Sequence, residues 1–252
     1  MKKLTIITAT YNSGETLERY LKSVVSQLND SCELIIIDGG SSDNTVEIIS
    51  NYSQYLSYWI SEPDKGVYDA WNKAITVSKG EWITFIGSDD ELCPGAITKY
   101  FEFINSSNQN EDLICGKINL IRKSGLPPKI IGEPWNWERL KYRKWSLAHP
   151  GMLHHRNLFK KNGMYDINYK ICGDVEFLVR IGPDIKASFI DFCFVNMYQG
   201  GLSGTYKSIY EGYKARCGVL NPIVNNLILL RFTCRYILRI LRSKVLSIIH
   251  TE

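Results

Sequence analysis

Several signatures of well-known protein classes are absent from this sequence of 252 residues. No heptad repeat persists, and 19 glycines and 8 prolines are ordinary usage, which excludes coiled-coil, collagen-like and low-complexity classes. Hydrophobic residues make up 44% of the chain and charged residues 22%, so a mainly disordered chain is also excluded. The length suits one large globular domain, or one domain with a small appendage.

Signals for secretion, disulfide bonding and membrane insertion are also lacking. The seven cysteines are scattered without a C-x-x-C pair or a zinc-binding spacing, which predicts buried small side chains in a reducing cytosol. The apolar run at residues 4–8 is too short for a signal peptide. No stretch of 18 uncharged apolar residues occurs, so we expect no ordinary transmembrane helix.

The first hundred residues alternate short apolar runs with segments of helical periodicity, which predicts βαβ units and a parallel sheet. The expected strands are residues 4–9, 33–37, 58–61 and 82–86, and the expected helices are residues 15–27, 46–52 and 67–77. Beyond residue 105 the pattern is less regular. There we expect a strand or hairpin at 111–121, a strand at 188–195, a helix at 174–181 and a loop at 124–134.

Acidic side chains follow the expected strands. Asp38 follows the second strand, and Asp89 and Asp90 follow the fourth, at the sheet edge where open α/β folds bind ligands. Carboxylates there suit Mg²⁺ or Mn²⁺ bound together with substrate phosphates, although a solvated turn that caps a helix is the alternative. The sequence has neither G-x-G-x-x-G nor G-x-x-x-x-G-K-[ST], which disfavours a dinucleotide site and a P-loop.

Six segments, in order and covering about residues 1–205, together resemble the family 2 glycosyltransferases. They are TATYN from residue 8, IDGGSSDNT from 37, EPDKGVYDAWNKAI from 62, GEWITFIGSDD from 80, HPGMLHHRNLFKKNGMYDINYKICGD from 149 and GGLSG from 200. The resemblance implies an α/β GT-A fold, Rossmann-like, with a mostly parallel central sheet flanked by helices. It also implies a catalytic domain at 1–220, with a nucleotide-sugar part at 1–105 and an acceptor and catalytic-base part at 106–220.

Carried over position by position, the resemblance assigns the donor-binding residues. These are Thr8, Ala9, Tyr11, Glu15, Asp38, Lys65, Gly66, Asp69 and Asp89. Asp38 would bind the uracil edge, although it could instead close a turn. The family's D-x-D motif is present as Ser88, Asp89 and Asp90, with Ser at its first position, and Asp90 would be the metal ligand. His149 is a further metal or phosphate candidate, or else a structural histidine.

The resemblance assigns the catalytic base to Asp174, which begins a D-x-x-x-x-x-R segment that ends at Arg180. A carboxylate there would remove the proton of the acceptor hydroxyl, while the metal stabilises the leaving nucleoside diphosphate. Because no second, nucleophilic carboxylate is assigned, we expect a single displacement that inverts the anomeric configuration. Glu176 is the rival for the base, and capping of a helix is the alternative role of Asp174.

The net charge of +4 is concentrated near the end of the chain. Residues 223–250 hold five basic residues and no acid, so the rest of the chain sums to −1. The arginines recur at helical spacing beside a broad apolar face: Arg231, Arg235, Arg239 and Arg242, with Leu227, Leu230, Ile237, Leu238, Leu241, Leu246 and Ile249. This basic amphipathic tail, 221–252, is typical of helices that lie on anionic membranes. Packing on the body or pairing of two copies is the alternative, and no motif indicates nucleic-acid binding.

Together these observations predict an inverting glycosyltransferase that uses a UDP-sugar and Mn²⁺ or Mg²⁺. By resemblance, its acceptor would be a lipid-diphosphate-linked saccharide of bacterial O-antigen or capsule. The enzyme would then be cytoplasmic and peripheral on the inner face of the cell membrane. A non-catalytic nucleotide-sugar-binding protein is the first rival. A nucleotidyltransferase is the second, but the first expected loop, TATYNSGE, lacks the basic phosphate-binding residues that it needs.

Overall fold

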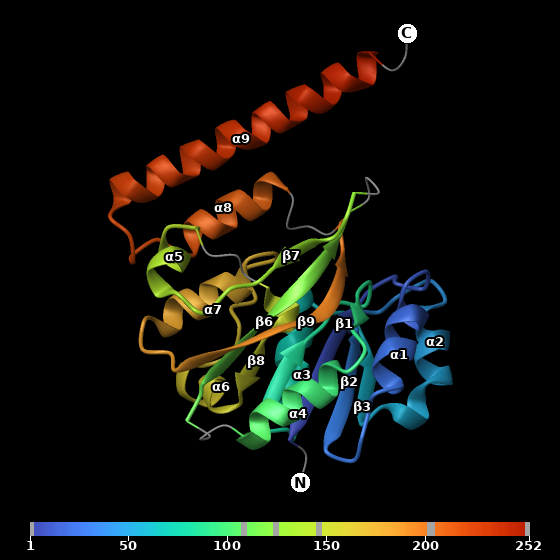
Figure 1. Ribbon diagram of the computed structural model, residues 1–252. Coiled ribbons are helices and arrows are strands. Elements are labelled where there is room, and N and C mark those ends of the chain that lie inside the picture. Colours follow the sequence, from blue (N-terminus) through green and yellow to red (C-terminus); the bar gives the residue numbers. More distant parts are fainter. Residues whose placement is uncertain (1–2, 107–109, 123–125, 145–147, 201–204, 250–252) are drawn as a thin grey trace.

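The computed structural model describes residues 3–106, 110–122, 126–144, 148–200 and 205–249. Within them, one mixed sheet has the strand order β3-β2-β1-β4-β8-β6-β9-β5, with β7 beside β6 (Figure 1). The strands are β1 Leu4–Thr10, β2 Cys32–Asp38, β3 Tyr58–Ser61, β4 Trp82–Phe85, β5 Glu91–Leu92, β6 Leu113–Ile121, β7 Lys129–Ile131, β8 Leu153–His155 and β9 Ala187–Tyr198.

Helices cover both faces of this sheet. They are α1 Leu17–Val25, α2 Thr45–Asn51, α3 Val67–Val77, α4 Ala96–Ser106, α5 Trp137–Lys141, α6 Asn157–Asn162, α7 Gly173–Ile181, α8 Tyr206–Lys214 and α9 Pro222–Ile249. Alternate residues of β2 enter two different cores: Leu34 and Ile36 pack with α1 and α4, whereas Ile35 and Ile37 pack with α3 and α7. Burial on both faces explains why this strand is continuously apolar.

The first half of the sheet is parallel and the second half is mixed. Strands β3, β2, β1 and β4 pair in parallel, as the alternating pattern predicts. The short strand β8 then pairs antiparallel with both β4 and β6, and β6 pairs in parallel with β9. The predicted α/β class is therefore confirmed, while the parallel pairing lies mainly within the first 105 residues.

Several predictions about local structure need correction. The expected loop at 124–134 contains β7, which pairs with β6 because its backbone continues the sheet edge. Helices α4 and α8 and strands β5 and β8 were not expected. Among the cysteines, Cys217 and Cys234 are exposed rather than buried, because they lie after α8 and on the outer side of α9. The GGLSG segment, residues 200–204, lies mostly outside the described residues.

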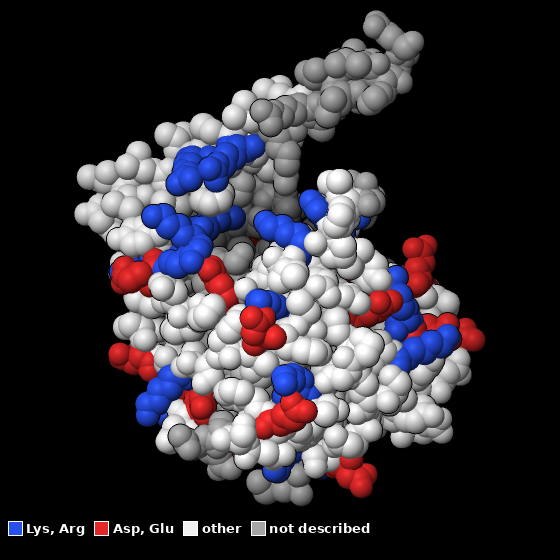
Figure 2. Space-filling model, in the orientation of Figure 1, with Lys and Arg blue, Asp and Glu red and all other residues white. Residues whose placement is uncertain are grey.

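Helix α9 extends along α8 at the end of the molecule farthest from the N-terminus (Figure 1). Its exposed apolar side chains form one stripe: Ile223, Leu227, Leu230, Ile237, Leu238 and Leu241. Asn225 faces inward, and Arg231 and Arg235 are exposed. Lys and Arg side chains gather on α9 and the elements beside it on the face shown in Figure 2. No described helix is long and apolar enough to cross a bilayer.

Candidate active site

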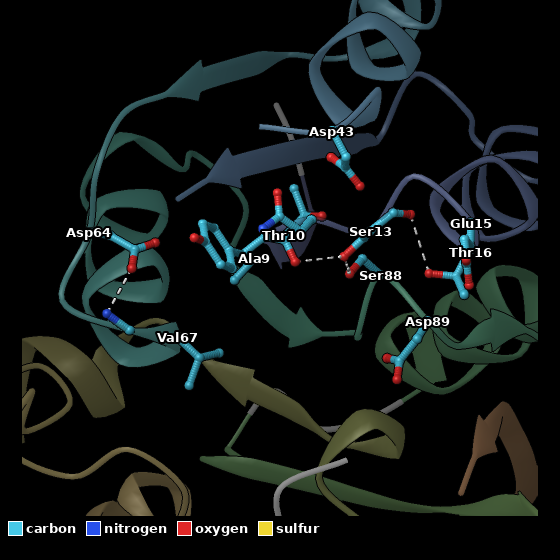
Figure 3. Close-up of a pocket in the computed structure, with 13 residues that line it drawn as sticks. Ala9, Thr10, Ser13, Glu15, Thr16, Asp43, Asp64, Val67, Ser88 and Asp89 are labelled. Atoms are coloured by element: carbon cyan, nitrogen blue, oxygen red, sulfur yellow. Dashed lines mark hydrogen bonds between the residues drawn. The ribbon is translucent and has the colours of Figure 1, made fainter. Parts of the chain in front are cut away.

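The loops that follow β1, β2, β3 and β4 enclose a cavity of about 610 Å³, which we call the strand-end cavity. It is lined by Ala9, Thr10, Tyr11, Asn12, Ser13, Glu15, Thr16, Asp43, Asp64, Gly66, Val67, Ser88 and Asp89. Asp43, Asp64 and Asp89 approach it from different sides (Figure 3). The cavity therefore lies at the carboxyl edge of the parallel strands, where the sequence predicts a ligand.

Hydrogen bonds between loops fix the shape of this cavity. The backbone of Asn12 is left-handed, with φ +48°. The Asn12 N–H donates to Ser41 Oγ at 2.7 Å, and Asn12 Oδ1 accepts from the Ser42 N–H at 2.9 Å. Gly40 has φ +82°, and a Cβ there would lie 3.3 Å from the backbone nitrogen of Pro63. The positive φ favours glycine at this position, and the loop after β3 leaves little room for a side chain. Three loops are thus locked together before any ligand binds.

Five of the predicted donor-binding residues line the strand-end cavity: Ala9, Tyr11, Glu15, Gly66 and Asp89. Lys65 and Asp69 lie beside it, where the Lys65 N–H donates to Asp69 Oδ2 at 2.9 Å and closes the turn before α3. These two residues therefore shape the loop that carries Gly66.

Thr8 and Asp38 are fully buried. The Thr8 hydroxyl hydrogen-bonds to that of Tyr20 inside the core. The Asp38 carboxylate accepts from the N–H groups of Gly40 and Ser41 at 3.1 and 2.9 Å, and from the Ser61 hydroxyl at 2.6 Å. In this structure both side chains serve the fold, and their contact with a donor stays a prediction.

A second cavity, of about 530 Å³, adjoins the first, and we call it the Asp174 cavity. Val67 lines both cavities, and the segment after β4 gives Ser88 and Asp89 to one and Gly87 and Asp90 to the other. The Asp174 cavity has aromatic and charged walls: Tyr68, Trp71, Phe85 and His149, with Asp90, Arg143, Lys170 and Asp174. Its size and its few convergent polar groups are typical of a substrate site.

Asp174 lies half-buried in the first turn of α7. Its Oδ1 accepts from the Val175 N–H at 2.8 Å and from the Tyr68 hydroxyl at 3.2 Å. Burial raises the pKa of Asp174 to about 6, against the lowering effect of these two hydrogen bonds. Near neutral pH the carboxylate is therefore mostly ionised yet more basic than an exposed Asp, as proton abstraction requires.

The segment leading into α7 is held by Glu211 of α8, a buried carboxylate. Its Oε2 accepts from three successive N–H groups, those of Lys170, Ile171 and Cys172, at 3.1, 2.8 and 3.0 Å. Three such bonds to one charged group fix the backbone strongly. The position of Asp174 is therefore set from one side by α3, through Tyr68, and from the other by α8.

Asp89 and Asp90 converge on Gly87. A Cβ at residue 87 would lie 2.7 Å from Asp89 Oδ1 and 3.0 Å from Asp90 Oδ2, so only glycine leaves the space between the two carboxylates open. Burial, and then the charge of Asp89, raises the pKa of Asp90 to about 7. Two hard oxygen atoms around a small gap fit a divalent cation. No group of three or more His, Cys, Asp or Glu side chains that could hold a metal occurs in the described part of the chain.

His149 lies on the wall of the Asp174 cavity. Its ring stacks on Trp71 at a centroid distance of 5.1 Å, and its Nε2 lies 3.4 Å from the Tyr165 hydroxyl. Burial lowers the pKa of His149 to about 3, so the imidazole is neutral. The neutral ring is the form that ligates metals, but the stacking shows a packing role as well. Its metal contact stays a prediction.

The Tyr68 hydroxyl provides a direct check on how Asp174 is held. Tyr68→Phe removes a hydrogen bond to the carboxylate, so we expect the pKa of Asp174 to rise by roughly one unit. Titration of the side-chain carboxyl by NMR measures this value. Tyr165→Phe is the matched control, because Tyr165 lies nearby without a hydrogen bond to Asp174. An unchanged Asp174 pKa in Tyr68→Phe would show that this hydrogen bond is not made in solution.

Several cavity residues were not assigned by sequence reasoning. Asp43 and Asp64 fall inside the segments that resemble the family, so the signal was present, but their side chains could equally have capped turns. Arg143 precedes the HPG segment, and Lys170 lies inside that segment but is one of several basic residues there, so neither stands out in the sequence. Contacts with α8 hold both at the cavity: Arg143 Nη1 donates to the Ile209 carbonyl, and the Lys170 N–H donates to Glu211.

A model of glycosyl transferase family 2 matches residues 5–167 of this chain, well over half of its length. The chain belongs to glycosyl transferase family 2. The match covers the strand-end cavity and most of the Asp174 cavity, and Asp174 itself lies just beyond its last residue.

Two relatives in this family are similar over most of their length. A PGL/p-HBAD biosynthesis glycosyltransferase of Mycobacterium bovis is 28% identical over 207 residues, which is 79% of this chain and 78% of the relative. The poly(ribitol-phosphate) β-N-acetylglucosaminyltransferase TarP of Staphylococcus aureus is 28% identical over 242 residues, which is 84% of this chain and 73% of TarP.

Solved structures of glycosyltransferases share the fold. S. aureus TarS, residues 1–349, in complex with UDP-GlcNAc superposes with a TM-score of 0.66 at 19% identity, covering 92% of this chain and 71% of that one. The mannosyltransferase PcManGT of Pyrobaculum calidifontis, in complex with GDP-Man and Mn²⁺, gives 0.63 at 15% identity, covering 90% and 68%. These likenesses confirm the GT-A architecture of this family 2 member.

Proposed function

We propose that this enzyme transfers a hexose or N-acetylhexosamine from a UDP-sugar to a lipid-diphosphate-linked saccharide, as part of bacterial surface polysaccharide synthesis. The observation that carries the proposal is the pairing of two cavities that share Val67 and the segment Gly87 to Asp90. One lies at the strand ends, where the family binds its nucleotide, and the other contains a basic carboxylate, Asp174.

The chemistry assigned to this arrangement is a single displacement. Asp174 accepts the proton of the acceptor hydroxyl as that oxygen attacks the anomeric carbon, and the bond from this carbon to the diphosphate oxygen breaks. The aromatic wall formed by Tyr68, Trp71 and Phe85 suits the apolar face of a sugar ring and keeps water away from it. Attack from the face opposite the leaving UDP inverts the anomeric configuration.

A divalent cation, Mn²⁺ or Mg²⁺, would be held by Asp90, with Asp89 beside it and the donor diphosphate completing the shell. When bound, such a cation neutralises charge on the departing diphosphate. The gap that Gly87 leaves between the two carboxylates supports this assignment, as does the Mn²⁺ in the PcManGT complex. Because serine occupies the first position of the motif, the metal would be held by the acids at the later positions, Asp89 and Asp90.

The experiment that tests the function is release of UDP from a panel of UDP-sugars, with Mn²⁺, with and without a lipid-diphosphate saccharide. We expect release that depends on the acceptor for one or a few donors. Tight binding of UDP without any turnover would instead support a non-catalytic nucleotide-sugar-binding protein. Release of pyrophosphate from UTP and a sugar 1-phosphate, tested in a parallel reaction, would indicate a nucleotidyltransferase.

The pH dependence of the reaction follows from the pKa of Asp174, which is about 6. A base must be deprotonated to act, so kcat/KM should fall about tenfold per pH unit below this value and level off above it. Initial rates from pH 4.5 to 8 at saturating metal measure this limb. A rate that stays constant down to pH 4.5 would rule out a base with this pKa.

We also propose that residues 1–220 form the catalytic unit and that 221–252 hold it on the inner face of the cell membrane. The exposed apolar stripe of α9 and the exposed Arg231 and Arg235 support this division. An interfacial helix of this kind inserts its apolar side while its arginines meet anionic head groups. Pairing of two copies through the stripe is the competing use of the same surface.

Neutralising two tail arginines tests membrane binding. Arg231→Gln with Arg235→Gln should weaken binding to anionic vesicles about 30-fold, because each basic residue contributes about 1 kcal/mol at such a surface. Co-sedimentation with phosphatidylglycerol vesicles measures the effect, with Lys160→Gln and Lys161→Gln of α6 as a control of equal charge change. An equal loss in both double variants would indicate nonspecific attraction. A change of oligomeric state on size exclusion would favour pairing of copies.

A further inference from the structure

Two guanidinium groups meet at α8 behind the Asp174 cavity. A Cβ on Gly212 would lie 3.2 Å from Nη1 of Arg143 and 3.4 Å from Nη1 of Arg216. Arg216 is buried, and its Nε and Nη1 donate to the carbonyls of Leu140 and Gly212 at 3.1 and 2.5 Å. Arg143 lines the cavity and makes only one long hydrogen bond to a described residue, from Nη1 to the Ile209 carbonyl at 3.4 Å.

Neither guanidinium has an ion-pair partner among the described residues. The buried carboxylate of α8, Glu211, already accepts hydrogen bonds from the three N–H groups before α7. Burial and then the charge of Arg143 lower the pKa of Arg216 to about 10. The charge of Asp174 acts on Arg216 without an ion pair at contact distance, and it offsets only part of the cost of burying Arg216 beside the half-buried Arg143. Such an arrangement is typical of a site whose anion arrives with a ligand.

The backbone of Arg143 points to the same conclusion. Its φ is +54°, in the left-handed region that residues with a Cβ seldom adopt. Strain of this kind persists only where the surrounding structure fixes it, and it is common at ligand-binding sites. Here it follows the end of α5 and turns the side chain toward α8 and the Asp174 cavity.

We infer that Arg143, supported by Arg216, binds a phosphate or diphosphate group of the acceptor. This inference rests on the proposed function and names the anionic part of its substrate. The planar guanidinium offers paired N–H donors that match phosphate oxygens, which a lysine cannot reproduce. The acceptor hydroxyl would lie at Asp174 and the phosphate at Arg143, on the wall of one cavity of about 530 Å³.

The position of Arg143 favours the acceptor over the donor. The two cavities meet at Val67 and at the segment from Gly87 to Asp90, and Arg143 lines only the cavity that contains Asp174. A different cation, Lys170, packs against Gly66 at that junction, with its Cδ 3.5 Å from where a Cβ would stand. Its Nζ donates to the carbonyls of Lys65 and Ile167 at 2.5 and 2.9 Å, which holds Lys170 on the side of the Asp174 cavity next to the donor.

Arg143 also contacts the tail helix. Its guanidinium lies 4.3 Å from the ring centroid of Phe232, on the side of α9 that faces the body. The opposite side of α9 carries the exposed apolar stripe. A phosphate bound at Arg143 would therefore lie close to the helix that we assign to the membrane, which is where the diphosphate of a lipid-linked acceptor would be.

A binding experiment tests this site without turnover. Citronellyl diphosphate and the uncharged alcohol citronellol are titrated into full-length protein saturated with UDP and Mg²⁺, so that the donor site is occupied. We expect Arg143→Gln to weaken binding of the diphosphate about 10- to 100-fold and to leave citronellol unchanged. Arg143→Lys, which keeps the charge, should lie in between. Arg139→Gln is the control of equal charge change, because Arg139 lies in α5 just before Arg143, does not line the Asp174 cavity and pairs with Glu133 at 2.7 Å.

Three results would overturn the inference. If wild type and Arg143→Gln bind the diphosphate equally, or if neither binds it, Arg143 does not form a phosphate site. An equal loss in Arg139→Gln shows general attraction only. A weaker affinity for UDP alone in Arg143→Gln assigns the residue to the donor. A wild-type protein that binds the diphosphate but turns over no UDP-sugar contradicts the proposed function while leaving this site in place.

Discussion

Asp174→Asn is expected to lower kcat for sugar transfer by about 1,000-fold, because general-base catalysis typically contributes 100- to 10,000-fold. Asn keeps the size of the side chain and can still accept the hydrogen bonds from Val175 and Tyr68, so the fold and the cavity should persist. The Kd for UDP should stay within about twofold of wild type, because Asp174 does not line the strand-end cavity. Calorimetric titration with UDP and a UDP-release assay measure the two quantities.

Glu176→Gln is the control for this prediction, because Glu176 is the rival base. Its carboxylate lies 2.8 Å from Nε of Arg180, and the residue lines neither cavity. We therefore expect Glu176→Gln to keep most of the activity. Full activity in Asp174→Asn, or a larger loss in Glu176→Gln, would move the base away from Asp174.

Asp90→Asn should produce the second large effect, a loss of about 100-fold in kcat/KM together with the loss of metal-stimulated UDP binding. Asp90 is 4% exposed, and its Oδ1 accepts from the Tyr198 N–H at 3.2 Å, so the isosteric amide should leave the loop in place. UDP affinity is measured with Mn²⁺ and with a chelator. The variant should bind UDP equally in both conditions and as weakly as the wild type does with the chelator.

Asp89→Asn provides the comparison. Asp89 is exposed and lines the donor side of the junction, so its loss should weaken donor binding less than the loss of Asp90. If Asp90→Asn still responds to Mn²⁺ as the wild type does, Asp90 is not the metal ligand. A variant that loses UDP binding even with the chelator would indicate a collapsed loop rather than a lost ligand.

Much of the strand-end cavity could be predicted from sequence because it is built from local units. Each strand of the parallel half is one short apolar run followed by a polar loop, and the expected boundaries of β3 and α3 agree with the structure. Parallel strands bring their carboxyl ends to one edge, so Ala9, Tyr11 and Asp89 could be placed together without knowing any distance.

The Asp174 cavity depends on contacts that no local pattern encodes. Strand β8 is three residues long and pairs antiparallel between β4 and β6, and nothing in its sequence separates it from a loop. Helix α8 is mostly polar, yet two residues on its inner side shape the cavity. Glu211 accepts hydrogen bonds from the segment before Asp174, and Gly212 leaves space for the guanidinium groups of the two arginines. The apolar spacing of Ala96, Ile97, Tyr100 and Ile104 would have revealed α4.

The measurement that tests the central claim most directly is the anomeric configuration of the product. The enzyme is incubated with the donor that supports UDP release and a saccharide acceptor, and the new linkage is examined by NMR. From an α-linked UDP-sugar, the account predicts a β-linked product, because the acceptor oxygen activated by Asp174 attacks opposite the departing UDP. An α-linked product, or free sugar as the only product whatever the acceptor, would contradict it.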